Sequence, residues 1–219
     1  MDIDEIKVEY DLSDYQIKKY GALFDTLDVT KDGLIDFVDF VIGAQAVKME
    51  YGWSDKDPLY LDLITAKANF WVIIHAYLGT IPENKINKNQ FIQFYGEIKD
   101  AVEKGKTVRF GIKELSFNKN ASPAWLTSVM ITIFKNIDFD ESHCITQKEY
   151  KVYLEAIEVP VNKMDFESIW NIITANNPDK GIKIDFMEEL LMQWLLNRDE
   201  NDPKPGDYFP CGGYYVQWK

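Results

Sequence analysis

Cysteine is scarce in this chain of 219 residues, which contains only Cys144 and Cys211. Small secreted domains use a denser disulfide framework, so the sequence favours a reducing compartment. Clustered basic residues are lacking too, because acidic side chains outnumber basic ones and the formal net charge is −12. This surplus argues against nucleic acid or an anionic membrane surface as a partner, and it makes cations the expected partners.

Long hydrophobic runs are also missing. The most apolar stretch, around residues 70–75, is far shorter than the roughly 20 residues that span a bilayer. The first residues are acidic where a signal peptide is basic, and no apolar stretch follows them. We therefore expect no transmembrane segment and a cytoplasmic location. A composition that is 46% hydrophobic and 14% aromatic still predicts a large packed core.

A repeated pattern of helix, polar loop and helix organises the chain. Apolar residues recur at helical spacing before two polar segments of twelve residues, 28–39 and 138–149. A second helical pattern follows each segment, from Phe40 and from Tyr150, and Ser13 is a candidate N-cap for the first helix. The apolar residues at matching offsets are Tyr20, Leu23, Phe24 and Leu27 in the first copy and Met130, Ile133, Phe134 and Ile137 in the second.

Two fainter copies fit the same spacing, at residues 79–90 and at about 177–188. We number the four loops one to four in chain order, so that the strong copies are loops one and three. The isoleucines expected at the eighth loop position are Ile35, Ile86, Ile145 and Ile184. A short strand at this position would join neighbouring units, so we expect two pairs of units.

The first loop, DVTKDGLIDFVD, carries oxygen-bearing side chains at alternate positions and a glycine at position 6. Alternate residues of a curled loop point inward, toward a hard cation that prefers oxygen ligands. The pattern resembles the EF-hand calcium loop, whose ligands come from positions 1, 3, 5, 7, 9 and 12. The resemblance assigns the side chains of Asp28, Thr30, Asp32, Asp36 and Asp39 and the carbonyl of Leu34, with Gly33 supplying the sharp turn.

Position 12 of loop one departs from this pattern, because Asp39 is one methylene shorter than the usual glutamate. A shorter side chain reaches the ion less easily as a bidentate ligand, so fewer oxygens surround the metal. We predict a weakened preference for Ca²⁺ and tolerance of Mg²⁺, which takes six-fold geometry.

The third loop, DFDESHCITQKE, offers a full set of ligands, including glutamate at position 12. Its unusual residue is His143 at position 6, where a left-handed backbone costs a non-glycine residue roughly 1 kcal/mol or somewhat more. Histidine tolerates that region better than most residues, so we favour simple tolerance over a role in pH sensing or ligation. The ligands assigned by resemblance are the side chains of Asp138, Asp140, Ser142, Thr146 and Glu149 and the carbonyl of Cys144.

Loops two and four lack the carboxylates of the strong copies, and we expect them to brace the working loops without binding metal. The disruptive residues are Gly79, Ile81 and Gln90 in loop two and Pro178, Ile182 and Lys183 in loop four. Asp179, Asp185 and Glu188 leave metal binding by loop four open if the chain takes an altered register.

The spacing of the units and the segments 102–105 and 122–134 resemble the sarcoplasmic calcium-binding proteins, calexcitin in particular. The resemblance covers most of the chain and is poor over 106–120 and after Asn201. It implies a compact all-α protein with four EF-hand units in two pairs, acting as a Ca²⁺ buffer or signal transducer. The expected divisions are a first pair at 1–104, a linker or surface loop at 105–121, a second pair at 122–198 and an aromatic tail at 199–219.

Luciferin-binding proteins, which are related to that family, motivate an alternative: a calcium-regulated carrier of a small hydrophobic ligand. Aromatic residues at helical spacing more often form plain core, although they would also suit a cavity. The aromatic end of the tail, 208–219, is expected to dock back as a lid or to meet a partner. The tryptophans concerned are Trp53, Trp71, Trp125, Trp170 and Trp194.

Only one segment resembles an enzyme motif, namely DAVEKGKT at 100–107, which is similar to a P-loop. A P-loop links a strand to a helix, whereas this segment follows a predicted helix, and Asp100 would repel phosphate. The sequence has no Ser-His-Asp, Cys-His or zinc-ligand arrangement, and His75 is expected to sit satisfied in a helix. We therefore expect a protein that is not an enzyme.

Overall fold

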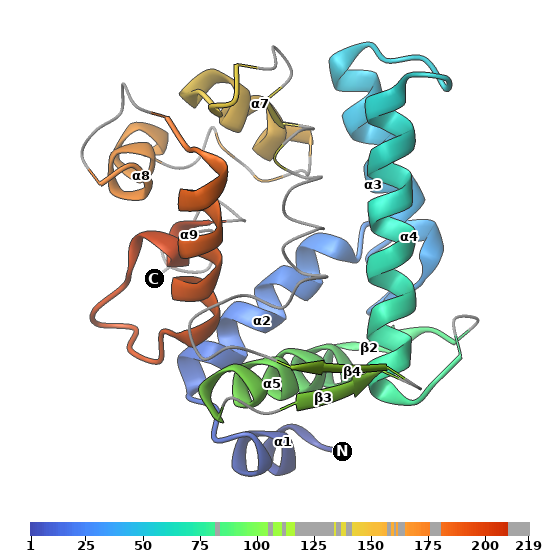
Figure 1. Ribbon diagram of the computed structural model, residues 1–219, viewed down its shortest axis with the longest axis vertical. Coiled ribbons are helices and arrows are strands. Elements are labelled where there is room, and N and C mark those ends of the chain that lie inside the picture. Colours follow the sequence, from blue (N-terminus) through green and yellow to red (C-terminus); the bar gives the residue numbers. More distant parts are fainter. Residues whose placement is uncertain are drawn as a thin grey trace.

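The computed structural model describes residues 1–81, 84–104, 107–110, 113–116, 134, 137–138, 142–156, 159, 161, 165–175 and 181–209. Over these residues the chain is mainly helical, with short antiparallel strands between the helices (Figure 1), which confirms the predicted all-α class. No helix in the described part of the chain is long and apolar enough to cross a membrane. The first half contains α1 (Ile3–Glu9), α2 (Asp14–Leu27), β1 (Leu34–Ile35), α3 (Phe37–Tyr51), α4 (Pro58–Leu78), β2 (Ile86–Asn87) and α5 (Lys88–Lys104). The second half contains β3 (Thr107–Phe110), β4 (Lys113–Ser116), α7 (Gln147–Ala156), α8 (Phe166–Ile173), α9 (Ile184–Leu196) and the 3-10 helix η3 (Pro205–Tyr208).

The start of α2 is fixed by a reciprocal capping interaction. The Ser13 hydroxyl accepts the backbone N–H of Gln16 at 3.2 Å, and the Gln16 side-chain oxygen accepts the backbone N–H of Ser13 at 3.1 Å. These bonds satisfy two donors that a helix N-terminus otherwise leaves unpaired. The predicted N-cap at Ser13 is confirmed.

The loops meet in pairs through their eighth positions. β1 and β2 are antiparallel, with Ile35 opposite Ile86, as the spacing predicted. In the second half Ile145 forms a bridge with Ile182, and the two residues exchange backbone hydrogen bonds of 2.9 and 3.0 Å. The expectation that Ile184 pairs here was wrong by two residues, because Ile184 already begins α9 and the extended backbone needed for pairing lies before it.

The helices that leave loops one and three begin earlier than predicted. α3 starts at Phe37 rather than Phe40, and α7 starts at Gln147 rather than Tyr150. The reason is that the last residues of each loop already form the first helical turn, with position 9 as the cap and position 12 as its partner. The twelve-residue loop and the helix therefore overlap.

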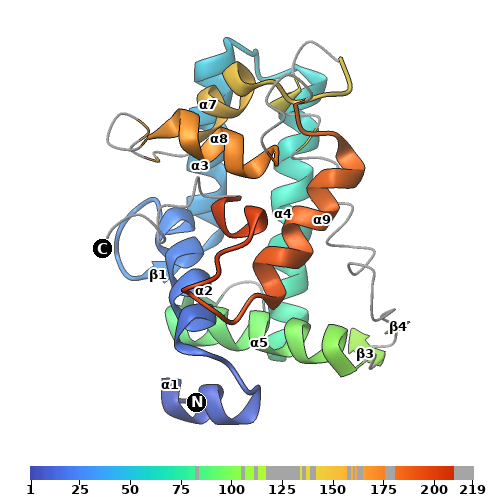
Figure 2. The same ribbon diagram turned by 90° about the vertical axis from the view of Figure 1, so that its left-hand side faces the viewer.

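The helices surround a core that is shared by the two halves. α2 and α5 cross at one end of the molecule, α3 and α4 run side by side along one flank, and α8 and α9 lie on the other flank (Figures 1 and 2). The Trp194 ring of α9 meets the rings of Tyr20 and Tyr95 edge-on, with centroids 5.4 and 5.2 Å apart. The predicted shared aromatic core is confirmed by this cluster, whose large fully buried members include Trp170, Trp194, Tyr20, Tyr150, Phe24, Phe91, Phe94 and Phe209.

The short helix α1 packs against α5, where a glycine permits the close approach. A Cβ atom on Gly96 would lie 3.0 Å from Cγ of Tyr10, closer than nearly all side-chain contacts allow. The hydroxyl of Tyr10 donates to Glu97 at 3.0 Å on the next residue of α5. These contacts seat the N-terminal segment against the first pair of units.

A β-hairpin lies in the segment predicted to be a linker or surface loop. β3 pairs with β4 in antiparallel register, from Thr107 opposite Ser116 to Phe110 opposite Lys113. The prediction for 105–121 was therefore incomplete over these strands. A β-branched and aromatic composition in β3 is typical of strands, but a pair of four-residue strands leaves only a weak sequence signal.

The beginning of the aromatic tail docks onto the core. Tyr208 is 9% exposed and Phe209 is fully buried, with its ring stacked on that of Tyr150 at a centroid distance of 5.6 Å. η3 packs against α9 and α8, and Figure 2 shows it lying alongside α9. Docking back is confirmed for these first residues, whereas the rest of the tail, 210–219, lies outside the described residues.

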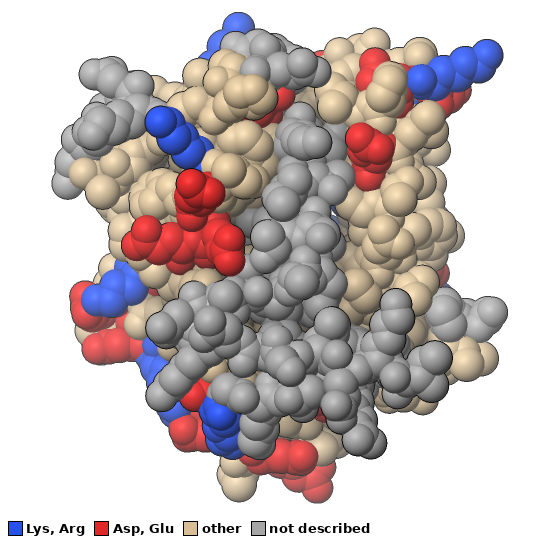
Figure 3. All heavy atoms as spheres, viewed as in Figure 1, with Lys and Arg blue, Asp and Glu red and all other residues tan. Residues whose placement is uncertain are grey.

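Charged groups are unevenly spread over the face shown in Figure 3. Acidic and basic side chains lie close together along the edge near α1 and the end of α9, while the surface over α4 is mainly uncharged. Leu61 and Val72 of α4 are 49% and 53% exposed. Scattered exposed apolar residues of this kind are usual on soluble domains and carry no functional argument alone.

Candidate metal centres

Loop one begins where α2 ends. Asp28 is the C-cap of α2 and is only 4% exposed. One of its carboxylate oxygens accepts the backbone N–H of Gly33 at 3.0 Å, which closes the curl of the loop between positions 1 and 6. Gly33 has a φ of +82°, so the left-handed turn expected at position 6 is present. The other oxygen of Asp28 lies 3.5 Å from the hydroxyl of Thr30 at position 3.

Both carboxylate oxygens of Asp39 are used within loop one. Oδ1 accepts the backbone N–H and the hydroxyl of Thr30, each at 3.0 Å, and Oδ2 accepts the backbone N–H of Asp36 at 2.8 Å. Asp39 is 2% exposed, so these bonds replace the water that the carboxylate loses on burial. Positions 1, 3 and 12 are therefore brought together on one side of the loop.

The carboxylates at positions 5 and 9 converge on a lysine from loop two. Nζ of Lys85 lies 2.8 Å from Oδ2 of Asp32 and 3.3 Å from Oδ2 of Asp36. The hydrogen bond from Lys85 lowers the pKa of Asp32, and the two carboxylates raise the pKa of Lys85. Position 7, Leu34, lies in β1 and is held opposite Asn87. The ligand positions of loop one are thus divided between two groups.

Loop three repeats the curl of loop one. Asp138, 4% exposed, accepts the backbone N–H of Ser142 at 2.9 Å on Oδ1 and that of His143 at 2.8 Å on Oδ2. His143 has a φ of +63°, which confirms that it occupies the left-handed turn despite its side chain. The Ser142 hydroxyl lies 3.2 Å from Asp138 and 3.0 Å from the carbonyl oxygen of Cys144. Positions 1, 5 and 7 therefore come together, while Asp140 at position 3 lies outside the described residues.

Glu149, at position 12 of loop three, differs from Asp39 in one respect. Its Oε2 accepts the backbone N–H of Thr146 at 2.7 Å and the Thr146 hydroxyl at 2.6 Å. Its Oε1 is buried and has no hydrogen-bond partner among the described residues, although Glu149 is only 2% exposed. An unpaired buried carboxylate oxygen is costly, so this atom marks a place where a cation would be stabilising.

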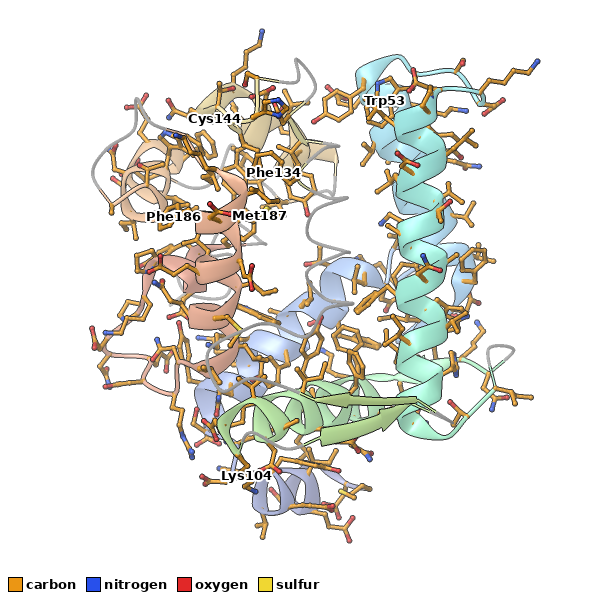
Figure 4. All side chains as sticks on the ribbon, viewed as in Figure 1. Trp53, Lys104, Phe134, Cys144, Phe186 and Met187 are labelled. Carbon is orange, nitrogen blue, oxygen red and sulfur yellow. The ribbon has the colours of Figure 1, made fainter. Side chains whose placement is uncertain are left out.

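The side chains around loop three continue into the core. Figure 4 shows Phe134, Phe186 and Met187 on the same side of the molecule as Cys144, whereas Lys104 lies at the opposite end near α1. Phe134 is 5% exposed and Met187 is fully buried. Both belong to the same buried core as Ile145 of loop three, and close packing of such a core limits how far the loop can move.

Loop two keeps the hydrogen bonds between positions 9 and 12 of the working loops, but makes them with uncharged amide side chains. Asn87 and Gln90, at positions 9 and 12, exchange side-chain to backbone hydrogen bonds of 3.0 Å each. Loop four is placed by the Ile145–Ile182 bridge, which puts Ala175, Lys183 and Phe186 at positions 1, 9 and 12. These three side chains offer no carboxylate oxygen, and Asp185 and Glu188 fall in α9 rather than at ligand positions. Asp179, at position 5 of this register, lies outside the described residues.

Within the described residues, no three His, Cys, Asp or Glu side chains converge closely enough to form a ready cage for a metal ion. In loop one the ligand side chains form two separate groups. Asp28, Thr30 and Asp39 contact one another, whereas Asp32 and Asp36 are bridged by Lys85. The donor set still fits Ca²⁺ or Mg²⁺, since it consists of carboxylate, hydroxyl and carbonyl oxygens.

Two other segments singled out in the sequence have structural roles. His75 is buried in α4, with Nδ1 2.7 Å from the hydroxyl of Thr80, so the expected hydrogen-bond partner is present for this ring nitrogen. The P-loop-like segment 100–107 starts in the last turns of α5 and ends at the first residue of β3. This order, helix to strand, is the reverse of the order in a P-loop.

Comparisons with known proteins agree with this architecture. No family model matches the chain, and no curated protein matches its sequence. The sarcoplasmic calcium-binding protein from amphioxus is similar in structure, with a TM-score of 0.65 and 18% identity over 95% of this chain and 100% of that one. Coelenterazine-binding protein from Renilla muelleri has a TM-score of 0.62 and 16% identity, over 89% of this chain and 94% of that one. A calcium-binding protein from Streptomyces coelicolor has a TM-score of 0.61 and 15% identity, over 82% and 97% of the two chains. The chain therefore has the fold of the EF-hand proteins, as its resemblance to the sarcoplasmic calcium-binding proteins predicted.

Proposed function

We propose that this protein binds two divalent cations, one in loop one and one in loop three, and that Ca²⁺ is the principal ion. The observation that carries the proposal is the buried Oε1 of Glu149, which has no partner among the described residues. It belongs to the residue that supplies a bidentate carboxylate in an EF-hand loop, at the position where the sequence pattern requires it. The calcium-binding proteins that share this fold support the same conclusion.

Binding an ion would lower the cost of gathering like charges in a small loop. Four carboxylates lie within loop one, and loop three ends in a buried glutamate. An ion that binds the folded loop and not the unfolded chain stabilises the fold by mass action. The protein should therefore resist heat better when it is loaded.

We infer that loop one binds Ca²⁺ less selectively than loop three and accepts Mg²⁺. Both carboxylate oxygens of Asp39 accept hydrogen bonds, from Thr30 and Asp36, whereas Oε1 of Glu149 accepts none among the described residues. A loop that offers fewer oxygens suits Mg²⁺, which takes six ligands, better than Ca²⁺, which takes up to eight.

The role that fits this chain is that of a cytoplasmic Ca²⁺ buffer or signal transducer, close to calexcitin, rather than that of an enzyme. The two units of each pair, within 1–104 and within 122–198, would act as one working loop and one bracing loop. A sensor exposes a methionine-rich groove on binding, and the six methionines of this chain are scattered along the sequence. This composition favours the buffer role.

A substitution at position 12 tests the proposal directly. Glu149→Gln removes the charge but keeps the shape, so native mass spectrometry should count one bound Ca²⁺ instead of two. Glu155→Gln is the matched control, because Glu155 lies on the same helix and is exposed. Two ions retained by Glu149→Gln at the affinity of the unaltered chain would contradict the assignment of loop three.

A second candidate function is the calcium-regulated carriage of a small hydrophobic ligand. Nε1 of Trp194 is buried in the shared core and has no acceptor among the described residues. A buried indole N–H normally finds a partner, and an oxygen of an internal ligand would provide one. The similarity of fold to the coelenterazine-binding protein agrees with this alternative.

The carrier hypothesis predicts an organic guest in the purified protein. Intact native mass measured before and after denaturation would reveal it, and Trp194→Phe should reduce its occupancy without changing the number of bound Ca²⁺ ions. An empty protein, whose mass equals that of the chain and its metal ions, would dismiss the carrier role.

A further inference from the structure

Lys85 reaches from the bracing loop into the ligand positions of loop one. It directly precedes β2, whose pairing with β1 fixes it beside loop one. Its Nζ bridges Asp32 and Asp36, at 2.8 and 3.3 Å, and these residues are positions 5 and 9 of the loop. One ammonium therefore occupies the oxygens that two ligand positions would give to a metal ion.

The neighbouring lysine of the same segment makes a different contact. Nζ of Lys88 lies 2.6 Å from Oδ1 of Asp25, which belongs to α2 and precedes the loop. Lys31, within loop one, donates to the backbone carbonyl of Asp25. Among these three lysines, Lys85 is thus the one whose ammonium bridges two ligand carboxylates.

A charged ammonium and a divalent ion cannot share these carboxylates at close range. The ion must displace Lys85, and the two positive charges repel each other if the side chain stays nearby. Before the ion arrives, however, the ammonium offsets the repulsion between the carboxylates. Lys85 therefore stabilises the ion-free state of loop one and destabilises its ion-bound state.

We propose that Lys85 competes with divalent cations for the carboxylates of Asp32 and Asp36 and thereby lowers the affinity of loop one. Loop two, which is expected to bind no metal itself, would then set the cation concentration at which loop one fills. The inference rests on the proposed function, since it presupposes that loop one binds such an ion. It assigns loop two a role beyond bracing, because the competing charge is delivered by the same strand pairing that holds the loops together.

The experiment measures Ca²⁺ and Mg²⁺ binding at loop one by calorimetry in chains that carry Asp138→Asn, which disables loop three. In this background, Lys85→Gln should raise the affinity of loop one about five-fold or more at low salt, and by less as added salt screens the charge. Lys88→Gln is the matched control, because it removes the same charge from the same segment, and it should change the affinity by less than about two-fold.

Thermal unfolding provides a second readout. Lys85→Gln should lower the melting temperature of the ion-free protein and should not lower that of the Ca²⁺-saturated protein. An ordinary surface ion pair would shift both melting temperatures alike and leave the affinity unchanged, and that result would overturn the inference. So would equal gains in affinity from Lys85→Gln and Lys88→Gln. If neither the Asp138→Asn chain nor its Lys85→Gln variant binds an ion, the proposed function fails at loop one and the inference falls with it.

Discussion

Nζ of Lys19 lies 2.8 Å from Oδ1 of Asp207, and neither side chain is exposed to solvent. Lys19 belongs to α2, which leads into loop one, and Asp207 belongs to η3, after the last long helix. The ammonium also donates to the backbone carbonyls of Trp194 and Asn197 at the end of α9. A cation is favourable at a helix C-terminus, so this contact ties the start of the fold to its end.

We predict that Lys19→Met destabilises the protein by about 3–5 kcal/mol, because it leaves the carboxylate of Asp207 buried without its cation. Lys18→Met is the control, since the ion pair of Lys18 with Glu200 is partly exposed and should contribute less than about 1 kcal/mol. Urea unfolding of both variants with chelator present measures the difference. Equal destabilisation by the two substitutions would contradict the structural role of the buried pair.

The residue at position 12 should set how strongly each loop prefers Ca²⁺. Asp39→Glu lengthens the side chain by one methylene and should increase the Ca²⁺ affinity of loop one and its preference over Mg²⁺. Glu149→Asp is the reverse change and should decrease both at loop three. Calorimetric titration with each ion checks the pair of variants, and a gain in Mg²⁺ preference by Asp39→Glu would refute the reasoning.

His143 should carry conformational strain that glycine relieves. Because its φ is +63°, His143→Gly is expected to stabilise the ion-free protein by up to about 1 kcal/mol. Gly33→Ala is the opposite test, since a Cβ there would meet nothing within 4 Å and only the backbone conformation opposes it. It should destabilise by about 1 kcal/mol in the same denaturant titration. A loss of stability in His143→Gly would show that the histidine side chain makes a compensating contact.

The bracing loops should matter to metal binding although the residues that the structure places at their ninth and twelfth positions carry no carboxylate. Ile86→Ala weakens the buried pairing with Ile35 and, in chains that also carry Lys85→Gln so that the competing charge is absent, should lower the affinity of loop one more than that of loop three. Ile182→Ala should do the converse through its bridge to Ile145. Each variant requires circular dichroism to verify that it is folded before titration. Identical effects of both substitutions on both loops would mean that the pairs do not act separately.

The sequence was sufficient to place those features that depend on local spacing. The turns at Gly33 and His143 and the opposition of Ile35 and Ile86 follow from counting along a twelve-residue loop. The helical class follows from apolar periodicity, and the cap at Ser13 follows from its side chain and position. Each of these is encoded by residues that are close together in the chain.

The features that the sequence analysis missed depend on tertiary contacts or on overlapping signals. Lys85 meets Asp32 across 53 positions in sequence, and Lys19 meets Asp207 across 188, so no local pattern reports either pair. The predicted register of loop four was wrong by two residues because Ile182 and Ile184 are equally good candidates by residue type. The feature that distinguishes them is that α9 begins at Ile184, and this start was not visible in the sequence. The early starts of α3 and α7 were hidden because their first turns carry ligand residues.

The measurement that tests the central claim most directly is metal content combined with thermal unfolding of the same sample, with and without excess chelator. We predict two divalent ions per chain in the presence of Ca²⁺, and a melting temperature that falls when the chelator removes them. A protein that carries no metal at saturating Ca²⁺, and that melts at the same temperature in both conditions, would contradict the account.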